Sequence, residues 1–510
     1  MYGAEIAKEL IDKYKDTRPV LMYGDPDVDG LISLLFLCQL GDMLGIDYTY
    51  YVNEKRQHGF VLEPEKLRGY LVISADFCVT EEVMRKLVEN DVVVVSTDHH
   101  EVQDTFIDIV NEETGARGIV INNQYPFEPV DNQYQSGAGV FYELMCDIYP
   151  EFKSDEREAL VGLTLLSDAR PIENDKARAY LKKTFNSNPQ QGYIGYLISN
   201  TLDADYNFGV PRLDRNYIDY TLAPHINSLL RFDRLDEAVN FILGQGLQSK
   251  TAKTKQADLV LAMKARASYL EMQNITVIGV AADAFPDFPN VDITNFIGLL
   301  CSNIKGAGKS VLGFVYDNGV VTRASFRGQY DDVHYRTGFR ELGINAQGHA
   351  GAFGILDFHP TAETWKDIDT LVGTLNEGHI VSAKIIDTQN LSFVMMQSGL
   401  KIATDNCYVR DMYRTYIRYK GIGAKIVKQT YRKVPFTQED SFAGLQPDEV
   451  SKGTSWKYLR DSEGNPIPKY IQYSVDGKQV KSFGVKIEDG LILPILEKGH
   501  VQLYIRENVT

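Results

Sequence analysis

Three short apolar runs, separated by helical patterns, constrain the fold of roughly the first 170 residues. Val20–Tyr23, Leu71–Ser74 and Val92–Ser96 are short and rich in branched apolar residues, which is typical of strands buried on both faces. Between them, Leu31–Leu44 and Glu81–Glu89 have the pattern of helices. Strand–helix–strand alternation predicts an α/β fold with a doubly wound parallel sheet.

The remainder of the chain predicts two further kinds of structure. Ile275–Ala281, Val311–Tyr316 and Val320–Phe326 indicate strands of a second, smaller α/β unit that closes near Ile355. After it the pattern becomes β-rich. The other expected elements are helices in Asp155–Thr184, a mostly helical arm over Leu235–Gln273, and strands at Val381–Ile386, Leu391–Met396, Tyr470–Val475 and Val501–Ile505.

Acidic and histidine side chains follow each of the three early strands. Ligands in an α/β sheet bind outside the carboxyl ends of the strands, so residues that follow neighbouring strands are expected to meet at one edge. Each residue alone has an ordinary explanation, such as a strand-end acid or a solvated turn, and their coincidence favours a shared site. The residues are Asp25, Asp27 and Asp29 after the first strand, Asp76 after the second, Asp98, His99 and His100 after the third, and Asp168 after a helical run.

A divalent metal cluster is the simplest explanation for so many carboxylates in one place. Crowded carboxylates repel one another and have raised pKa values unless a cation neutralises them. An oxygen-rich set with imidazole and no thiolate suits Mn²⁺ or Mg²⁺ better than structural zinc, and its size predicts two ions bridged by one aspartate. A calcium loop is excluded, because the twelfth position after Asp25 is Phe36 where a bidentate glutamate is required.

These residues resemble the four ordered motifs of the DHH phosphoesterase superfamily, in particular its RecJ type of single-stranded-DNA exonuclease. The motifs are Asp25–Gly30, Asp76, Asp98–His100 and Asp168, and the first has the DxDxDG form of the RecJ type. The resemblance implies two Mn²⁺ ions, with Mg²⁺ as an alternative. It implies that Asp98 orients His99, that His100 faces the scissile phosphate, and that the metal ligands are Asp27, Asp29, Asp76 as the bridge, His99 and Asp168, with Asp25 a ligand or just outside the ligand set.

Later segments extend the resemblance over about residues 18 to 356. Ser136–Val140 is similar to the segment after the third motif, 222–227 with Arg231 to the RecJ connector, and 345–352 to the GGHxxA loop of the second domain. The chain departs from these patterns at His225, where the connector has arginine, and at Gln347, the first glycine of the loop. The implied substrate contacts are His349, Gly348, Arg327, Ser325, Asn227 and Arg231.

The domain organisation expected from these observations has four parts. They are a DHH catalytic, metal-binding domain at 1–190, a helical connector at 191–272, a smaller DHHA1-like substrate-binding domain at 273–358, and a β-rich C-terminal domain at 359–510 that is a candidate for nucleic-acid binding.

The charge of the chain is unevenly distributed. The net charge is −16, yet residues 360–510 carry 20 lysines and arginines against 18 acidic residues. Lys401 to Lys433 contains nine basic residues against two aspartates, with five interleaved tyrosines. Basic and aromatic side chains together favour single-stranded nucleic acid, although a solvated surface is an equally ordinary reading. The candidate patch is Arg410, Arg414, Arg418, Lys420, Tyr416 and Tyr419.

The expected function is Mn²⁺-dependent hydrolysis of single-stranded DNA from the 5′ end to nucleoside 5′-monophosphates, in DNA repair, recombination or replication. The alternatives are a DHH phosphodiesterase for short oligonucleotides or cyclic dinucleotides, and a non-catalytic replication scaffold. Five scattered cysteines without a C-x-x-C pair, and no signal peptide, predict a soluble cytoplasmic protein without membrane association. DNA is expected over RNA from the resemblance, and the chain is expected to be a monomer or a homodimer.

Overall fold

The computed structural model describes residues 1–54, 59–77, 79–100, 106–129, 133–168, 170, 175–188, 190–201, 217–245, 251–305, 309–330, 333–377, 384–391, 415–451, 453–461, 463–483, 486–497 and 500–508. The chain divides into two compact units. The first is built mainly from Met1–Lys253, and the second is built from the chain after Thr254. Each unit is described by itself.

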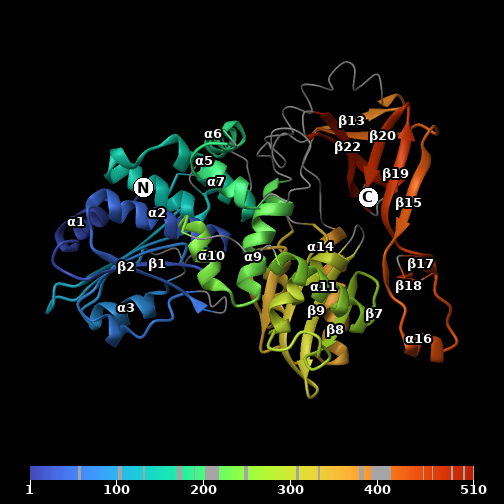
Figure 1. The fold of residues 1–510 in the computed structure, drawn as a ribbon, viewed down its shortest axis with the longest axis horizontal. Helices are drawn as coiled ribbons and strands as arrows, with labels where there is room; N and C mark the ends of the chain where they lie inside the picture. Colours follow the sequence, from blue (N-terminus) through green and yellow to red (C-terminus); the bar gives the residue numbers. More distant parts are fainter. Residues whose placement is uncertain are drawn as a thin grey trace. The chain divides into compact units, whose positions relative to one another are not determined.

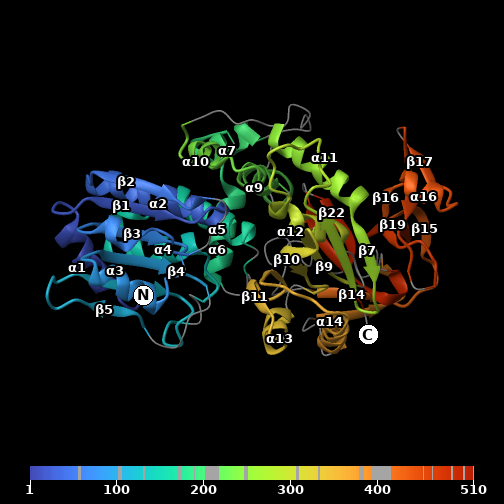
Figure 2. The same cartoon turned by 90° about the horizontal axis from the view of Figure 1, so that it is seen from below.

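A six-stranded sheet forms the centre of the first unit, with strand order β2-β1-β3-β4-β6-β5. All neighbouring strands are parallel except the edge pair of β5 and β6. Figure 2 shows β2, β1, β3 and β4 following one another across this sheet. The predicted doubly wound parallel sheet is therefore confirmed. The bounds are β1 Val20–Gly24, β2 Tyr48–Val52, β3 Leu71–Ala75, β4 Val93–Asp98, β5 Asp108–Val110 and β6 Arg117–Asn122.

Helices cover both faces of this sheet. Helices α2, α4 and α5 pack against one another on one face, while α3 packs against β4, β5 and β6 on the other. In Figure 1, α2 and α3 lie on opposite sides of this sheet. Helix α2 is apolar on nearly all sides because it lies between the sheet and these neighbours. The bounds are α1 Ala4–Tyr14, α2 Val28–Leu44, α3 Glu81–Glu89, α4 Gly137–Ile148 and α5 Asp155–Ser167, with a short 3₁₀ turn at Pro64–Leu67 and another at Pro150–Phe152.

Further helices complete the first unit. The helical pattern expected over Asp155–Thr184 forms two helices, because α5 ends at Ser167 and Asp168 is its C-cap. Helices α6 and α5 then pack against each other. The bounds are α6 Asp175–Asn186, α7 Gly192–Thr201, a π-helical turn Ile218–Leu222, α9 Ala223–Arg231 and α10 Leu235–Ile242.

The second unit contains another six-stranded sheet, with order β11-β12-β10-β9-β8-β7. Only β8 and β9 are parallel. The three predicted strands are confirmed as β8, β9 and β10. The arm expected to be helical up to Gln273 instead ends in strand β7, whose largely exposed residues gave no strand pattern. The bounds are α11 Thr251–Arg266, β7 Ser268–Glu271, β8 Ile275–Ala281, β9 Ser310–Asp317, β10 Val320–Arg327, β11 Asn345–Gly348 and β12 Ala352–Leu356.

Helices lie on both faces of this second sheet. Helix α12 (Ile297–Ile304) contacts β9 and β10, and is preceded by a 3₁₀ turn at Ile293–Phe296. Helices α13 (Tyr335–Glu341) and α14 (Ala362–Glu377) pack together over a core shared with Phe326. Helix α14 therefore extends this α/β layer into the region that the sequence pattern indicated as β-rich.

The C-terminal part is β-rich, as predicted. Tyr470–Val475 and Val501–Ile505 lie in β19 and β22, and part of Val381–Ile386 lies in β13. The expected strand at Leu391–Met396 lies almost wholly outside the described residues. One sheet has the order β13-β14-β21-β22-β20-β19-β15 and the other β16-β18-β17. The bounds are β13 Lys384–Thr388, β14 Thr415–Tyr419, β15 Lys425–Tyr431, β16 Lys433–Pro435, α16 Gln438–Phe442, β17 Glu449–Ser451, β18 Thr454–Tyr458, β19 Pro468–Val475, β20 Lys478–Ser482, a turn Ile487–Asp489, β21 Gly490–Glu497 and β22 His500–Asn508.

Across the described ranges, no helix combines the length and apolar character that crossing a bilayer requires.

Candidate metal centre

The parallel register places three aspartates in one row at the sheet edge. Gly24 of β1 pairs with Ala75 of β3, and Ala75 pairs with Thr97 of β4. Because the strands are parallel, the residues that follow these three positions leave the sheet at the same edge. Those residues are Asp25, Asp76 and Asp98.

This edge also contains the point where the strand order reverses. The chain passes from β1 to β2 on one side of it, and then crosses to β3 on the other side of β1. Asp25 and Asp76 follow these two central strands and therefore flank the reversal point. Crevices at such points are the usual ligand sites of open α/β sheets.

The first turn of α2 supplies two more carboxylates. Asp27 is the N-cap of α2, and its Oδ1 accepts a hydrogen bond from the Gly30 amide at 2.9 Å. Asp29 is only 2% exposed and accepts hydrogen bonds from the amides of Gly137 at 2.7 Å and Ala138 at 3.1 Å. Those amides belong to the first turn of α4, where the partial positive charge of the helix stabilises a carboxylate. Sequence analysis did not assign a role to them, although the Ser136–Val140 resemblance indicated the segment.

Glycine is required beside Asp76 for a steric reason. Asp76 has a left-handed backbone conformation with φ of 65° and is 3% exposed. A Cβ atom on Gly137 would lie 2.4 Å from Asp76 Oδ1, and one on Gly30 would lie 2.4 Å from the carbonyl oxygen of Asp25. Both glycines therefore allow the acidic loops and the two helix starts to pack closely.

His99 lies among the carboxylates. Its Nε2 is 3.1 Å from Asp76 Oδ1 and 3.9 Å from Asp29 Oδ2, while its Nδ1 is 3.8 Å from Asp168 Oδ2. The imidazole is 3% exposed, and its Nδ1 makes no hydrogen bond to any described residue. Asp168 reaches the group from the C-terminal end of α5.

The pKa values of these groups reflect burial and crowding. Burial, followed by the charges of Asp168 and Asp27, raises the pKa of Asp29 to about 8. Burial and the charges of the surrounding aspartates, Asp29 first, raise the pKa of Asp76 well above its usual range. Burial lowers the pKa of His99 to about 3, so its imidazole is neutral. Without a cation, this set of carboxylates is therefore held in an unfavourable environment for ionisation.

Asp98 contacts His100 and not the ring of His99, so the expected pairing of Asp98 with His99 is wrong. Asp98 Oδ1 lies 2.7 Å from His100 Nδ1, and Asn122 at the end of β6 approaches the other carboxylate oxygen at 3.4 Å. Burial alone would lower the pKa of His100, but the charge of Asp98 and this hydrogen bond raise it to about 10. The neighbouring histidines thus differ: His99 is buried and neutral, whereas the half-exposed His100 is cationic.

The residues fit divalent ions. Three groups each bring ligand atoms within 4.8 Å of one another: Asp25 with Asp27 and Asp76, Asp29 with His99 and Asp168, and Asp76 with both histidines. Asp76 belongs to two groups and lies against His99 of the third, which is the position expected of a bridging ligand. The buried, unpartnered Nδ1 of a neutral imidazole and the oxygen-rich donor set suit Mn²⁺ or Mg²⁺. All of the predicted metal ligands therefore come together, and His100 lies beside them.

The predicted substrate residues of the second unit lie at one edge of its sheet. Arg327 of β10 pairs with Ala352 of β12. The exposed His349 precedes Ala352 by three residues, and the φ of 132° at Gly348 favours glycine at that position. Arg327 Nη1 donates to Ser325 Oγ at 2.9 Å, and Ser325 Oγ donates to the carbonyl oxygen of Phe353. Arg327 is thus held on the α12 face of the sheet, and its substrate role remains a prediction.

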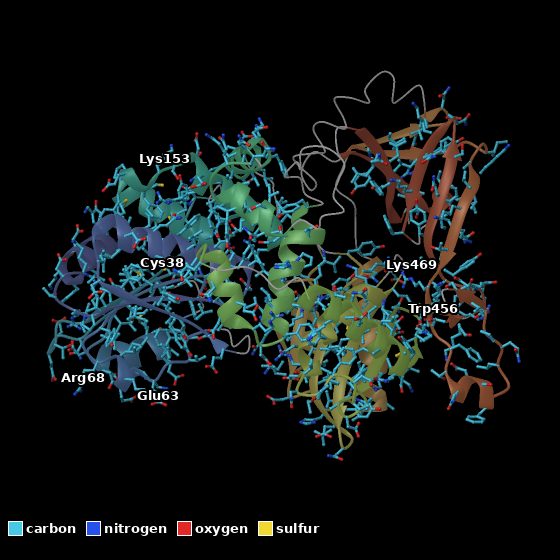
Figure 3. The ribbon with its side chains drawn as sticks, viewed as in Figure 1. Cys38, Glu63, Arg68, Lys153, Trp456 and Lys469 are labelled. Carbon is cyan, nitrogen blue, oxygen red and sulfur yellow. The ribbon has the colours of Figure 1, made fainter. Side chains whose placement is uncertain are left out.

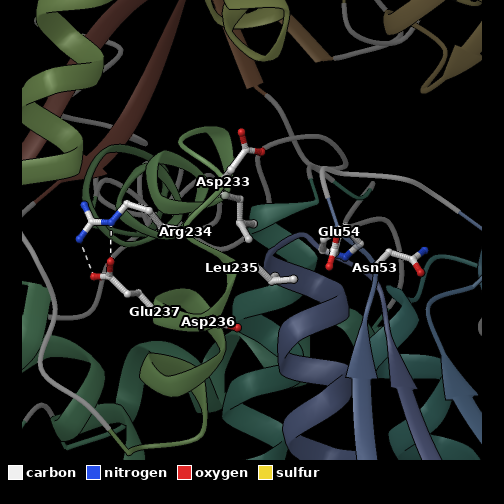
Figure 4. A pocket seen from close by; sticks show the side chains of 9 residues that line it. Asn53, Glu54, Asp233, Arg234, Leu235, Asp236 and Glu237 are labelled. Atoms are coloured by element: carbon white, nitrogen blue, oxygen red, sulfur yellow. Dashed lines mark hydrogen bonds and ion pairs between the residues drawn. The ribbon is translucent and has the colours of Figure 1, made fainter. Parts of the chain in front are cut away.

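The predicted connector residues, Asn227 and Arg231, lie on α9 within the first unit. A cavity of about 500 Å³ lies beside Pro26 and is lined by the start of α10. Asn227 and Arg231 do not line this cavity. The cationic lining residue, Arg234, is paired with Glu237 on one wall of the cavity. Glu54 lies on the opposite wall (Figure 4). Its remaining charged lining residues are acidic, so this cavity does not suit a phosphate group.

The predicted basic patch is largely contradicted. Tyr416 is 0% exposed and Tyr419 is 7% exposed, so neither ring is available to stack on a base. Arg418 and Lys420 both pair with Asp387, at 3.5 Å and 2.7 Å. Tyr419 packs with Ile417 in the apolar core of this sheet, and Tyr416 lies on the other face of β14. Arg410 and Arg414 lie outside the described residues.

Comparisons with known proteins agree with this fold. Residues 19–167 match the model of the DHH family, N-terminal domain. The single-stranded-DNA-specific exonuclease RecJ of Bacillus subtilis is 24% identical over 255 residues, which are 47% of this chain and 30% of that protein. The protein of the same name from Thermus thermophilus is 22% identical over 248 residues, or 34% of its length. The matched region thus spans about a third of these curated relatives.

Solved structures have a similar fold. The structure of Thermus thermophilus RecJ in complex with Mn²⁺ has a TM-score of 0.63 at 16% identity and covers 100% of this chain and 72% of its own. The structure of the same protein with Mg²⁺ has a TM-score of 0.55 at 14% identity, covering 100% of this chain and 71% of its own. The parallel sheet and its acidic edge lie in the region that matches the DHH-family N-terminal domain, residues 19–167. Among known proteins, the chain is similar in sequence and in fold to the RecJ exonucleases.

Proposed function

We propose that this chain is a divalent-metal-dependent phosphodiesterase that hydrolyses single-stranded DNA from its 5′ end and releases nucleoside 5′-monophosphates. The observation that carries the proposal is the convergence of five aspartates and the buried His99 at one sheet edge. The similarity to the RecJ exonucleases supports DNA as the substrate. Retention of the complete acidic set argues for catalysis over a purely structural role.

The protein residues position charge around the scissile phosphate. Bound Mn²⁺ or Mg²⁺ would lower the pKa of a water molecule to give hydroxide and would neutralise charge on phosphoryl oxygens. The chain holds Asp29 through the amides of α4 and Asp27 through the amide of Gly30, so both carboxylates are oriented before any ion binds. Such fixed orientation avoids reorganisation during the reaction.

The Asp98–His100 pair supplies a cation on the exposed side of the centre. Because His100 Nδ1 contacts Asp98, Nε2 is the ring nitrogen that remains for a phosphate oxygen. The half-exposed position of the imidazole leaves it accessible to substrate. We assign His100 to electrostatic stabilisation of the phosphoryl group, with Asp98 as its positioning residue.

A second candidate function is hydrolysis of a short substrate, such as a dinucleotide or cyclic dinucleotide. The burial of Tyr416 and Tyr419 favours this second candidate, because exposed tyrosine rings would have supported binding of an extended DNA strand. The metal chemistry is the same in both cases, so substrate length separates the two.

One assay distinguishes the two candidates. The chain is incubated with 5′-labelled and 3′-labelled single-stranded DNA, duplex DNA, and a cyclic dinucleotide, each with Mn²⁺, Mg²⁺ or EDTA. We expect metal-dependent release of the 5′ label as a mononucleotide, with Asp98→Asn slower by about 100-fold because His100 loses its carboxylate partner.

The control variant is Asp47→Asn, an exposed acid outside the site, which should retain full activity. Circular dichroism and thermal unfolding confirm that both variants are folded. Cleavage of the cyclic dinucleotide alone would select the second candidate. Absence of turnover with either metal would contradict both.

A further inference from the structure

A basic cavity of about 380 Å³ lies within the second unit, and none of its lining residues belongs to the metal centre. It is formed by the C-terminal ends of α11 and α12 together with strands β15, β16 and β19. Five of its lining side chains are cationic, whereas one, Glu449, is acidic. The cations are Lys264, Lys305, Arg432, Lys433 and Lys469.

The acidic side chain is already used by one of these cations. Lys433 Nζ lies 2.6 Å from Glu449 Oε1. Arg432 Nη1 donates to the carbonyl oxygen of Ile304 at 2.6 Å, which joins the end of α12 to the β-rich part. Lys264 and Lys469 form no ion pair with any described residue. Among the described residues that line the cavity, cationic side chains therefore outnumber acidic ones by five to one.

The pKa values of the lining residues show the same imbalance. Burial, followed by the charges of Lys469 and Arg432, lowers the pKa of Lys264 to about 8. Burial lowers the pKa of Arg432 to about 10. Desolvated like charges disfavour their own ionised forms, and an anion among them would reverse that effect.

Aromatic side chains lie beside the cations. Tyr431 and Phe483 line the cavity, and the Phe483 side chain is 49% exposed. Lys433 Nζ lies 4.8 Å from the centre of the Trp456 ring. Trp456 and Lys469 are both on the C-terminal strands (Figure 3). Cations next to an accessible aromatic face are the combination that binds a phosphate and its base together.

We propose that this cavity binds a nucleoside monophosphate at a site separate from the metal centre. The cationic walls recognise the phosphate, and Phe483 provides a face for the base. A volume of about 380 Å³ is within the range of small-ligand pockets and suits one nucleotide better than a longer strand. The proposal goes beyond the reaction proposed at the metal centre and does not depend on it.

The test measures binding of adenosine 5′-monophosphate to the full chain by isothermal titration calorimetry in EDTA. EDTA removes metal-mediated binding at the acidic site, and an Asp76→Asn background makes that exclusion independent of the chelator. We expect Lys469→Glu to weaken binding at least about tenfold, because it reverses a charge that has no ion-pair partner in the described structure. Lys478→Glu is the matched control, since Lys478 is exposed on the neighbouring strand and does not line the cavity. Equal affinity of the two variants would overturn the proposal.

Three further probes test what the cavity recognises. Adenosine and inorganic phosphate should each bind at least about tenfold more weakly than the monophosphate, because each makes only half of the contacts. Phe483→Leu should weaken binding of the monophosphate and leave that of phosphate unchanged. Phosphate bound as tightly as the monophosphate would overturn recognition of the base. A single-stranded oligonucleotide that binds with the same Lys469 dependence, while the monophosphate does not, would assign the cavity to a nucleic-acid strand.

Discussion

Two clusters of charged residues in the sequence led to opposite structural outcomes. The acidic residues of the first unit come together at one sheet edge. In the described part of the basic and aromatic segment, Tyr416 and Tyr419 are buried and Arg418 and Lys420 pair with Asp387, so these residues do not form a comparable surface. The difference lies in position along the strand. Residues that follow parallel strands share an edge, whereas residues within a strand are divided between its two faces.

The largest expected effect is that of Asp76→Asn. This variant removes the carboxylate common to two groups of ligand atoms, so activity should fall by about 1,000-fold or more. Metal should stabilise the native chain by about 2.7 kcal/mol at a concentration 100 times its Kd, and the variant should lose most of this gain. Thermal unfolding with and without Mn²⁺ measures it.

The matched control for this prediction is again Asp47→Asn, which should keep both the activity and the metal-dependent stabilisation. If Asp76→Asn were stabilised by Mn²⁺ as much as the native chain, the acidic residues would not form a shared centre. The contrast between the two charged clusters would then be lost.

An intermediate effect is expected for Gly137→Ala. The added Cβ would lie 2.4 Å from Asp76 Oδ1, so either the carboxylate or the first turn of α4 must move. We expect activity lower by about 10-fold to 100-fold and unfolding free energy lower by about 1–3 kcal/mol. Urea unfolding and the nuclease assay measure the two effects.

Gly354→Ala is the control for steric crowding, because its added Cβ would meet no atom closer than 3.8 Å. Its unfolding free energy should change by less than that of Gly137→Ala. Native activity in Gly137→Ala would show that the amides of α4 do not orient the acidic residues.

The smallest effect is expected from the double variant Arg418→Gln and Lys420→Gln. Both side chains pair with Asp387, so single-stranded DNA affinity should change by less than about 2-fold, with an unchanged salt dependence. Fluorescence anisotropy in a salt titration measures both. A fivefold loss with a flatter salt dependence would restore this segment as a DNA-binding surface and weaken the comparison.

The acidic centre could be predicted well from the sequence because its residues directly follow strands that a local apolar pattern reveals. Buried parallel strands are recognisable as short branched runs, and the residue after each run must lie at the sheet edge. That reasoning placed Asp25, Asp76 and His99 correctly without knowledge of the connecting loops. It also placed the central strands of the second sheet within one or two residues of their observed ends.

The remaining features depend on contacts between distant residues and had no local signal. The pairing of Asp98 with His100 depends on the direction of each side chain beyond the strand. The amides that bind Asp29 come from residues 108 and 109 positions later in the chain. Strand β7 has largely exposed residues, so no apolar pattern distinguished it from the helical arm.

The hydrogen bonds from Gly137 and Ala138 to Asp29 have a consequence for the order of assembly during synthesis. A ribosome must complete the chain through the start of α4 before Asp29 can be oriented, and through Asp168 before the last ligand is present. Residues from Asp25 onward therefore emerge long before they can form a high-affinity ion site. Closing a loop of this length is slow relative to local helix formation. We therefore expect ion binding to be a late event in the biogenesis of the first unit, and nascent chains released before Asp168 should not retain the metal.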